Sequence, residues 1–363
     1  MAADPPGSDR AVVVAPDRTP APLANLALRT LAALKADETA IAQPRQLIVS
    51  ADGSAMFTTI AAALAVAIDG DEILVRPGEY RESVVIDKSV RILGGGPGAA
   101  IVVRPPAADE PCFRIVGGEA HVAGLSIDGT EFDDYDNFDS VLVEVVGGSP
   151  TLDELDIRGG GGVVFSRAGT RGAVTRCAIH DGQVIGIEVR DGASPRIEDN
   201  EIWGTGELYI FGAGSDPLVR ANRIHDGQSY GIWVSHGASP RIEDNEVWGN
   251  AGDGLHIAYS DPLVRANRIH DGQSTGIWVR HGASPRIEDN EIWGNARAGL
   301  GITGAGSDPL VRANRIHDGQ ATGILVHGGA SPRIEDNEIW GNALLPIHVE
   351  NASPNIGSNV TDD

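Results

Sequence analysis

The second half of the chain consists of two different repeated segments that alternate. SPRIEDNEIWGN or a close copy begins at Ser194, Ser239, Ser284 and Ser331, and DPLVRANRIHDGQ begins at Asp216, Asp261 and Asp308. The prolines of the two segments recur every 22 to 24 residues, at Pro195, Pro217, Pro240, Pro262, Pro285, Pro309, Pro332 and Pro354. Tandem repeats of this length predict a solenoid, in which each unit buries its apolar face only against its neighbours.

Each repeat has the pattern of short strands. Counted from its proline, position +2 is apolar and position +7 is Ile or Val through most of the array, as in Ile242 and Val247. A second apolar pair follows a Gly-rich bend, as in Ile232 and Val234. Alternating apolar runs broken by Gly, Pro, Asn and Asp are typical of strands. We therefore expect an all-β fold, a right-handed parallel β-helix of about 22–23 residues per coil; the Leu scaffold of a leucine-rich repeat is absent.

Position +5 is Asn in every repeat. The column contains Asn200, Asn222, Asn245, Asn267, Asn290, Asn314, Asn337 and Asn359, and Cys177 takes the place of Asn one coil earlier. Side-chain amides stacked in register bond along the axis of a parallel stack. We expect an inward asparagine ladder with a structural role.

Charges alternate between successive coils. Position +3 is Glu in one coil and Arg in the next, as in Glu243 and Arg265, and position +6 follows the same rule, as in Glu246 and Arg268. Adjacent strands lie about 4.8 Å apart, so each Glu is expected between two Arg of the neighbouring coils. A slip by one coil would place like charges together, and the pattern therefore fixes the register.

The chain divides into an N-terminal region and one long domain. We expect residues 1–20 to be disordered and residues 21–45 to form an amphipathic helix and a linker, with Leu23, Leu26, Leu31 and Leu34 on one face of the helix. The β-helix is expected over 46–363, with the N-terminal cap and first strands in 46–80 and near-identical repeats in 172–360. An Ala-rich helix over 57–68 would plug the open end of the array.

Composition limits the partners. The formal net charge is −23, which argues against nucleic acid, and no apolar run reaches 18 residues, so we expect no membrane span. The N-terminus has no basic region followed by an apolar core, so we see no signal peptide and expect a cytoplasmic location. Cys112 and Cys177 are isolated thiols without metal-ligand spacing. We expect no cofactor.

Two columns of side chains are candidate binding surfaces. At position +8 imidazole and indole alternate, and the column contains His180, Trp203, His225, Trp248, His270, Trp293, His317 and Trp340. Such a column either holds a sugar or a protein partner, or stacks on itself and stiffens the rod. Its histidines are about 9–10 Å apart, too far for one metal ion.

The second column lies on the next expected sheet and varies from coil to coil. It contains Glu188, Tyr209, Trp233, His256, Trp278, Leu325 and His348, with Gly301 as a gap. Repeat proteins commonly encode specificity where near-identical units differ. This column is therefore a candidate surface for a protein or a glycan.

An acidic insertion interrupts the earlier coils. It contains Glu131, Asp133, Asp134, Asp136 and Asp139. Asp133, Asp134 and Asp136 are candidate Ca²⁺ ligands, although they lack the spacing of a calcium loop. Asp133 and Asp136 are also candidates for an acid and a base. A solvated loop is the alternative. The neighbouring pair of His180 and Asp181 is a further acid–base candidate, but its copies in every second coil favour a structural role.

Two segments resemble known β-helix proteins. VSADGSAMFTTIAAALAVAIDGDEILVRPGEYRESVVIDKSVRILGGG resembles the opening of the pectin-lyase-like superfamily, and the SPRIEDNEIWGN coils resemble the repeats of NosD-like and F-box-only-11-like proteins. The resemblance covers roughly residues 46–360 and implies a right-handed β-helix. It implies carbohydrate binding or polysaccharide chemistry only weakly, because one fold hosts lyases, esterases, hydrolases, epimerases and scaffolds. The catalytic motifs of pectinesterases, polygalacturonases, alginate epimerases and pectate lyases are absent.

These observations leave two hypotheses for function. The first is a non-catalytic binding or scaffold protein that holds a protein or glycan on an aromatic-rich lateral face. The alternative is an enzyme of the pectin-lyase-like kind that acts on an acidic polysaccharide. An enzyme needs one irregular acidic cleft, whereas a binding protein needs a continuous stripe. The last coil has an open strand edge, which leaves end-to-end self-association as a further alternative.

Overall fold

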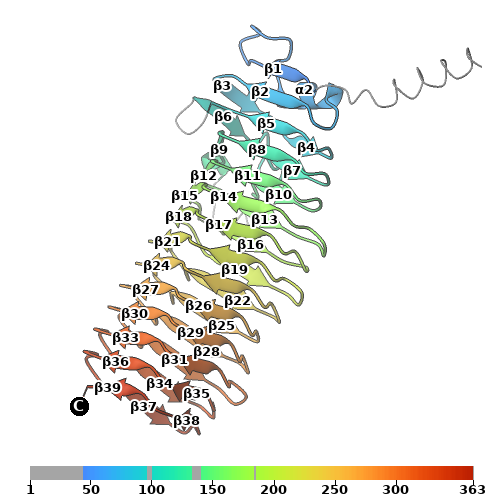
Figure 1. Ribbon diagram of the computed structural model, residues 1–363. Coiled ribbons are helices and arrows are strands. Elements are labelled where there is room, and N and C mark those ends of the chain that lie inside the picture. The colour runs from blue at the N-terminus through green and yellow to red at the C-terminus, as the bar shows by residue number, and fades with distance from the viewer. Residues whose placement is uncertain (1–43, 96–99, 133–139, 184, 363) are drawn as a thin grey trace, which may run out of the picture. The chain divides into compact units, whose positions relative to one another are not determined.

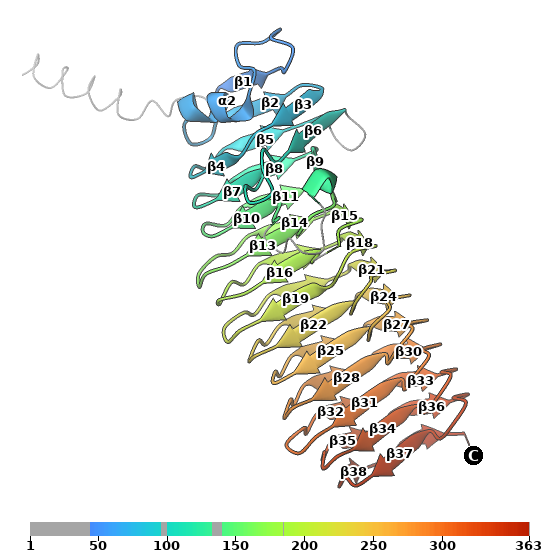
Figure 2. The same cartoon turned by 180° about the vertical axis from the view of Figure 1, so that it is seen from behind.

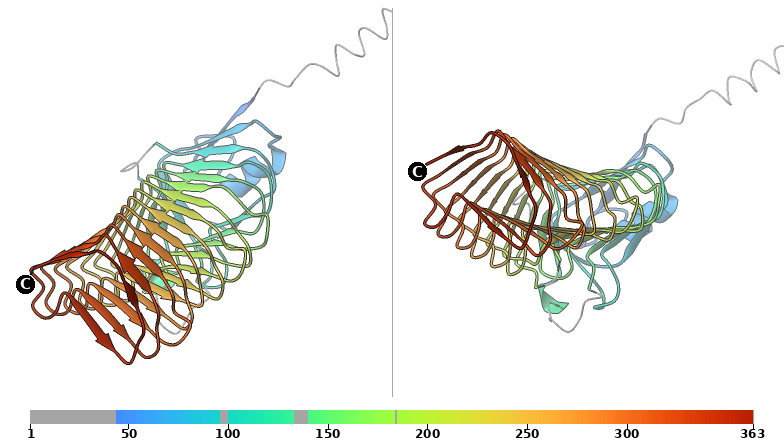
Figure 3. Two further views of the ribbon diagram at one scale, coloured as in Figure 1. Left: turned by 60° about the horizontal axis from the view of Figure 1, so that its bottom comes forward. Right: turned by 90° about the horizontal axis from the view of Figure 1, so that it is seen from below.

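The chain forms a parallel β-solenoid, as expected (Figures 1 and 2). The computed structural model describes residues 44–95, 100–132, 140–183 and 185–362. Its strands form three parallel sheets of 14, 13 and 12 strands, called sheets A, B and C here. Each coil crosses sheet A, then sheet B, then sheet C, and successive coils follow one another along the axis (Figure 3).

The strands are two to four residues long. Sheet A contains β1 (Gln46–Val49), β2 (Glu72–Val75), β5 (Arg91–Leu93), β8 (His121–Ala123), β11 (Thr151–Asp153), β14 (Ala173–Thr175), β17 (Arg196–Glu198), β20 (Leu218–Arg220), β23 (Arg241–Glu243), β26 (Leu263–Arg265), β29 (Arg286–Glu288), β32 (Leu310–Arg312), β35 (Arg333–Glu335) and β38 (Asn355–Ile356). Sheet B contains β3 (Gly78–Arg81), β6 (Ile101–Arg104), β9 (Ser126–Asp128), β12 (Asp156–Arg158), β15 (Ala178–His180), β18 (Glu201–Trp203), β21 (Arg223–His225), β24 (Glu246–Trp248), β27 (Arg268–His270), β30 (Glu291–Trp293), β33 (Arg315–His317), β36 (Glu338–Trp340) and β39 (Val360–Thr361). Sheet C contains β4 (Val84–Ile86), β7 (Phe113–Ile115), β10 (Val143–Val145), β13 (Val163–Phe165), β16 (Ile187–Val189), β19 (Leu208–Phe211), β22 (Ile232–Ser235), β25 (Leu255–Ala258), β28 (Ile277–Arg280), β31 (Leu300–Thr303), β34 (Ile324–His327) and β37 (Ile347–Glu350).

A short helix covers the first coil. α2 (Ile60–Val66) is shorter than the helix expected over 57–68, and Thr59 caps its N-terminus by accepting from the Ala62 N–H. It buries Ile60, Ala63 and Leu64 against the core. A single 3₁₀ turn, η1 (Thr130–Phe132), begins the acidic insertion. The predictions for residues 1–20 and 21–43 lie outside the described residues, and no described helix is long and apolar enough to cross a bilayer.

The core is a column of aliphatic side chains. One coil contributes Val219 from sheet A, Ile224 from sheet B, and Ile232 and Val234 from sheet C, and all four are at most 3% exposed. The adjacent coils place the same residue types at the same positions, as the strand pairing shows. Burial of this continuous column supplies the main free energy of folding.

The asparagine ladder lies inside the turn between sheets A and B, as expected. The Nδ2 group of Asn267 donates to the carbonyl of Ile242 (2.8 Å) and to Oδ1 of Asn290 (3.0 Å). Oδ1 of Asn267 accepts from the backbone N–H of Asn245 (3.0 Å). The ladder begins at Cys177, whose backbone N–H donates to Oδ1 of Asn200 (2.9 Å).

A second, sparser asparagine column was not anticipated. Asn250, Asn295 and Asn342 lie after the tryptophans of alternate coils, and each accepts from the backbone N–H of a glycine one coil earlier (2.9–3.1 Å). Their Nδ2 groups donate to core-strand carbonyls such as that of Ile269, at 3.2 Å from Asn295. These amides satisfy the backbone of the turn between sheets B and C.

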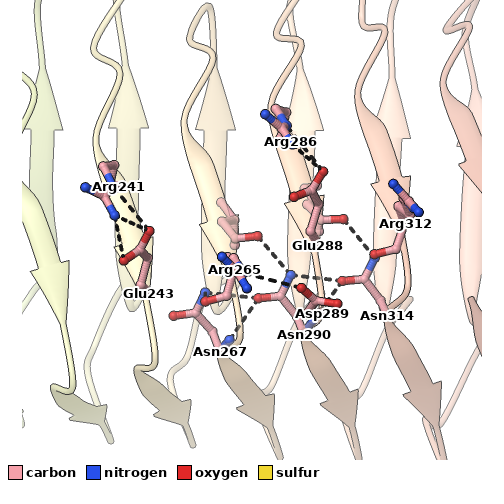
Figure 4. A network of polar contacts seen from close by, with 12 residues as sticks. Arg241, Glu243, Arg265, Asn267, Arg286, Glu288, Asp289, Asn290, Arg312 and Asn314 are labelled. Carbon is pink, nitrogen blue, oxygen red and sulfur yellow. Dashed lines mark hydrogen bonds and ion pairs between the residues drawn. The ribbon is translucent and has the colours of Figure 1, made fainter.

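The expected ion pairs between coils are confirmed on sheet B, whereas on sheet A most of them are replaced. On sheet B, Arg268 pairs with Glu246 of the preceding coil (2.7 Å), as expected. On sheet A, Glu198 pairs with Arg220 of the next coil (2.9 Å), as expected. In the later coils, Glu243 instead pairs with Arg241 of its own strand (2.8 Å), and Arg265 pairs with Asp289 (3.3 Å) (Figure 4). The expected ladder overlooked the Arg at position +1, which lies two residues away on the same face of the strand and competes for each Glu.

Candidate functional site

The imidazole and indole column at position +8 stacks on itself. It runs along the outer face of sheet B, and each histidine ring lies 4.1–4.4 Å from the following indole and 5.9–6.1 Å from the preceding one, with interplanar angles of 2–10°. Arg223, Arg268 and Arg315 also lie over Trp248, Trp293 and Trp340 at 5.2–5.3 Å. Ring faces are thus occupied within the column, and its stacking stabilises the rod itself.

The histidines of this column are held by carboxylates. Nδ1 of His180 contacts Asp181 (2.9 Å), and Nε2 contacts Asp156 (2.9 Å); the hydrogen bond with Asp156 raises the pKa of His180. The same contact joins His225 to Asp226 at 2.8 Å and is copied at His270 and His317. Because this His–Asp pair recurs in every second coil, we assign it a structural role.

The varying column occupies the outer face of sheet C. Strand pairing places Glu188, Tyr209, Trp233, His256, Trp278, Gly301, Leu325 and His348 in one row, as expected from the sequence. Tyr209 and Trp233 stack at 4.3 Å, but Trp233 and His256 meet edge to face at 6.1 Å and 89°. Regular stacking therefore stops in the middle of the row.

A buried Asp–His pair interrupts the row. Nδ1 of His256 contacts Oδ2 of Asp253 (2.9 Å), and both residues are buried. Oδ1 of Asp253 accepts from the Ser274 hydroxyl (2.8 Å) and the Thr275 N–H (3.1 Å). Tyr230 stacks on the imidazole at 4.4 Å. Since the carboxylate engages Nδ1, Nε2 is left buried with no hydrogen-bond partner among the described residues.

The indole of Trp278 lies over the next strand. A Cβ atom added at Gly301 would come 2.8 Å from Cε3 and 3.1 Å from Cζ3 of that indole. Trp278 is half-buried, and Gly301 is the residue that leaves it room. Because Gly301 has no side chain, the indole of Trp278 lies across the neighbouring strand, whereas the rings of sheet B stack along the axis.

Polar groups without partners gather around these rings. Nε1 of Trp233, Nε2 of His256 and Nε of Arg280 are buried and make no hydrogen bond among the described residues. At the N-terminal side of the row, burial raises the pKa of Glu188 and of Glu207, and it also raises those of Tyr209 and Tyr230. Unsatisfied groups and shifted carboxyls are characteristic of functional surfaces.

A shallow depression extends the face beyond Glu188. Its volume is about 360 Å³, and its lining includes Arg114, Glu144, Glu188 and Arg190. Both arginines are already paired, Arg114 with Glu144 and Arg190 with Glu188, each at 3.1 Å. The depression is therefore polar but internally neutralised.

The acidic insertion lies mostly outside the described residues. Asp133, Asp134, Asp136 and Asp139 fall there, whereas Glu131 pairs with Arg81 at 2.6 Å. Within the part of the chain that the structure describes, no group of three or more His, Cys, Asp or Glu side chains is arranged to hold a metal ion.

Sequence reasoning missed Asp253, Tyr230 and Arg280. The signal was present, because the residue two positions before each sheet C strand changes from Tyr230 to Asp253 to Thr275 in successive coils. The repeated columns are the stronger pattern in the sequence, while this break in the repeat carries the Asp–His pair.

Comparison with known proteins agrees with the architecture. The chain is similar in structure to a point mutant of the periplasmic alginate epimerase AlgG, with a TM-score of 0.60, 14% identity, and 80% of this chain and 77% of that chain covered. It is similar to the A-module of the Azotobacter vinelandii mannuronan C-5 epimerase AlgE6 (TM-score 0.56, 15% identity, 84% and 94% covered). It is also similar to the Dettilon tailspike protein gp208 (TM-score 0.56, 13% identity, 79% and 64% covered).

No curated protein matches the sequence significantly. The family model described as the right-handed beta helix region matches residues 121–263 and 251–361. With the three parallel sheets, this match covers most of the solenoid. The chain therefore belongs to the right-handed β-helix family and has the pectin-lyase-like form of that fold.

Proposed function

We propose that the protein binds a glycan chain on the outer face of sheet C, between Tyr209 and Trp278. The observation that carries the proposal is the indole of Trp278, which lies across Gly301 instead of stacking along the axis. Aromatic rings with a free face suit the apolar faces of sugar rings. The shared fold with polysaccharide epimerases supports a carbohydrate ligand as an analogy.

The sheet B column supports this proposal by contrast. Its rings have parallel neighbours from His180 to Trp340, so their faces are already covered. On sheet C the stacking is interrupted: Tyr209 stacks on Trp233, but Trp278 and His327 meet edge to face at 71°. A ligand therefore has ring surface to contact on sheet C.

The test is glycan binding by paired tryptophan variants. Trp278→Ala is expected to lower affinity for a bound polysaccharide at least tenfold in affinity electrophoresis and calorimetry, whereas Trp293→Ala on sheet B leaves affinity within about twofold. Both variants are compared by circular dichroism to confirm the fold. Equal losses in the two variants, or no glycan binding by the parent protein, would contradict the proposal.

Polysaccharide chemistry is a second candidate function, favoured by the Asp253–His256 pair. Among the described coils this pair occurs once, and it leaves Nε2 without a partner there, as a histidine base oriented by a carboxylate would. Incubation with pectin, polygalacturonate, alginate and neutral glucans, followed by mass spectrometry and NMR, tests it. Altered chains that His256→Gln no longer produces would support an enzyme; unaltered chains would leave binding alone.

A further inference from the structure

The outer face of sheet C carries less acid than the rest of this acidic solenoid. On sheets A and B every second coil presents a glutamate, such as Glu243 and Glu246. The five sheet C strands β22, β25, β28, β31 and β34 read IWVS, LHIA, IWVR, LGIT and ILVH, without Asp or Glu. We call the outer face of these five strands the strip; it extends about 19 Å along the axis. In a chain of net charge −23, it is a region whose strands have no acidic side chain.

Basic groups occupy the same strip. Arg280 ends β28, is partly buried, and forms no ion pair among the described residues. His327 ends β34, and its ring lies 6.2 Å from that of Trp278. Asp253, a carboxylate in the bend before β25, is buried and occupied by His256, Ser274 and Thr275.

The corner that follows the strip adds two exposed histidines. His236 follows β22 and His281 follows β28, with φ values of 56° and 58°. The equivalent corners of β19 and β31 have glycines, Gly212 and Gly304, which adopt this left-handed backbone without a Cβ penalty. Bulky residues at such positions carry a conformational cost. His281 follows Arg280 in the chain, and its ring stacks on Tyr259 of the preceding coil at 4.8 Å.

We propose that the glycan bound on this face is anionic, with a sugar ring on Trp278 and its acidic group at Arg280. The inference rests on the proposed function and names its ligand class: a polymer bearing carboxylate or sulfate groups. A guanidinium donates two parallel hydrogen bonds to either group. The rest of the acidic surface repels a polyanion, so this strip is where such a chain can approach.

The test compares three polymers at fixed pH and ionic strength: polygalacturonate, dextran sulfate and neutral dextran. Arg280→Gln is expected to weaken binding of the anionic polymers by about 10–100-fold, the loss typical of a charge-assisted contact. Arg280→Lys keeps the charge and is expected to retain part of the affinity. Arg312→Gln, a half-exposed arginine on sheet A, is the matched control and is expected to stay within about twofold of the parent.

The outcomes separate the two proposals. Binding of polygalacturonate alone identifies a carboxylated ligand, and binding of dextran sulfate alone identifies a sulfated one. If neutral dextran binds as tightly as both, or if Arg280→Gln binds normally while Trp278→Ala does not, the anionic ligand is wrong and the glycan face stands. If Trp278→Ala and Arg280→Gln both bind normally, or nothing binds, both proposals fail.

Discussion

The indole of Trp278 and the backbone of Gly301 are in direct contact across adjacent strands of sheet C, and a Cβ at position 301 would lie 2.8 Å from the ring. Every other member of this row has a side chain, from Glu188 to His348. The missing side chain thus sets the orientation of the ring. A glycine in a strand interior often marks such a close approach.

Gly301→Ala is expected to displace the indole without unfolding the protein. The new Cβ cannot be accommodated unless the ring moves, at a cost of about 1–3 kcal/mol of unfolding free energy. Near-UV circular dichroism and glycan affinity are expected to change together. Gly117→Ala is the control, because a Cβ added there meets nothing closer than 3.9 Å. Unchanged binding by Gly301→Ala would contradict a role for the indole that lies over Gly301.

Trp248→Ala is expected to destabilise the rod and leave glycan binding intact. The indole lies between His225 at 4.1 Å and His270 at 5.9 Å, with Arg223 over the ring. Loss of these contacts is expected to lower the free energy of unfolding by about 1–3 kcal/mol, measured by denaturant titration. A loss of affinity without a loss of stability would instead assign the sheet B column to binding.

The asparagine ladder predicts a difference between interior and terminal positions. Asn267→Ala would leave the Asn245 N–H and the Ile242 carbonyl buried without their partners, at a cost of about 2–5 kcal/mol. Asn359 lies in the last coil and is partly exposed, so Asn359→Ala is expected to cost less than about 1 kcal/mol. Equal losses in thermal denaturation would contradict the ladder as the source of the effect.

Asp71 is expected to link stability to acid pH. Its buried carboxylate accepts from Nη2 of Arg45 (2.5 Å) and from the Ile68 N–H (2.9 Å), and the Arg45 hydrogen bond lowers its pKa to about 2. An unfolded chain has an Asp pKa of about 3.9, so the stabilisation is present above that pH and is lost as pH falls toward about 2. Asp71→Asn should therefore lower the melting temperature most at about pH 5–7, with the difference shrinking by about pH 2.

The repeat pattern predicted the coils, the inward amides and the row on sheet C, because identical positions in stacked units must face the same way. It did not predict the ion pairs for which several neighbouring side chains compete. Glu243 has Arg220 and Arg265 on the adjacent strands and Arg241 on its own strand, and it pairs with Arg241. The buried Asp253–His256 pair was also missed, although the repeat breaks at Asp253, because the contact joins a bend to a strand in a single coil.

The alternation on sheet B also governs how the solenoid can change length. Arg268 contacts Glu246 one coil before it, and Trp293 lies against His270 and His317 on its two sides. Removal of one coil would place either arginine beside arginine and imidazole beside imidazole, or glutamate beside glutamate and indole beside indole. Removal of two coils restores every contact. Coils can therefore be duplicated or deleted without disturbing these contacts only in pairs. Each pair changes the length of the solenoid by about 9.6 Å, twice the strand spacing.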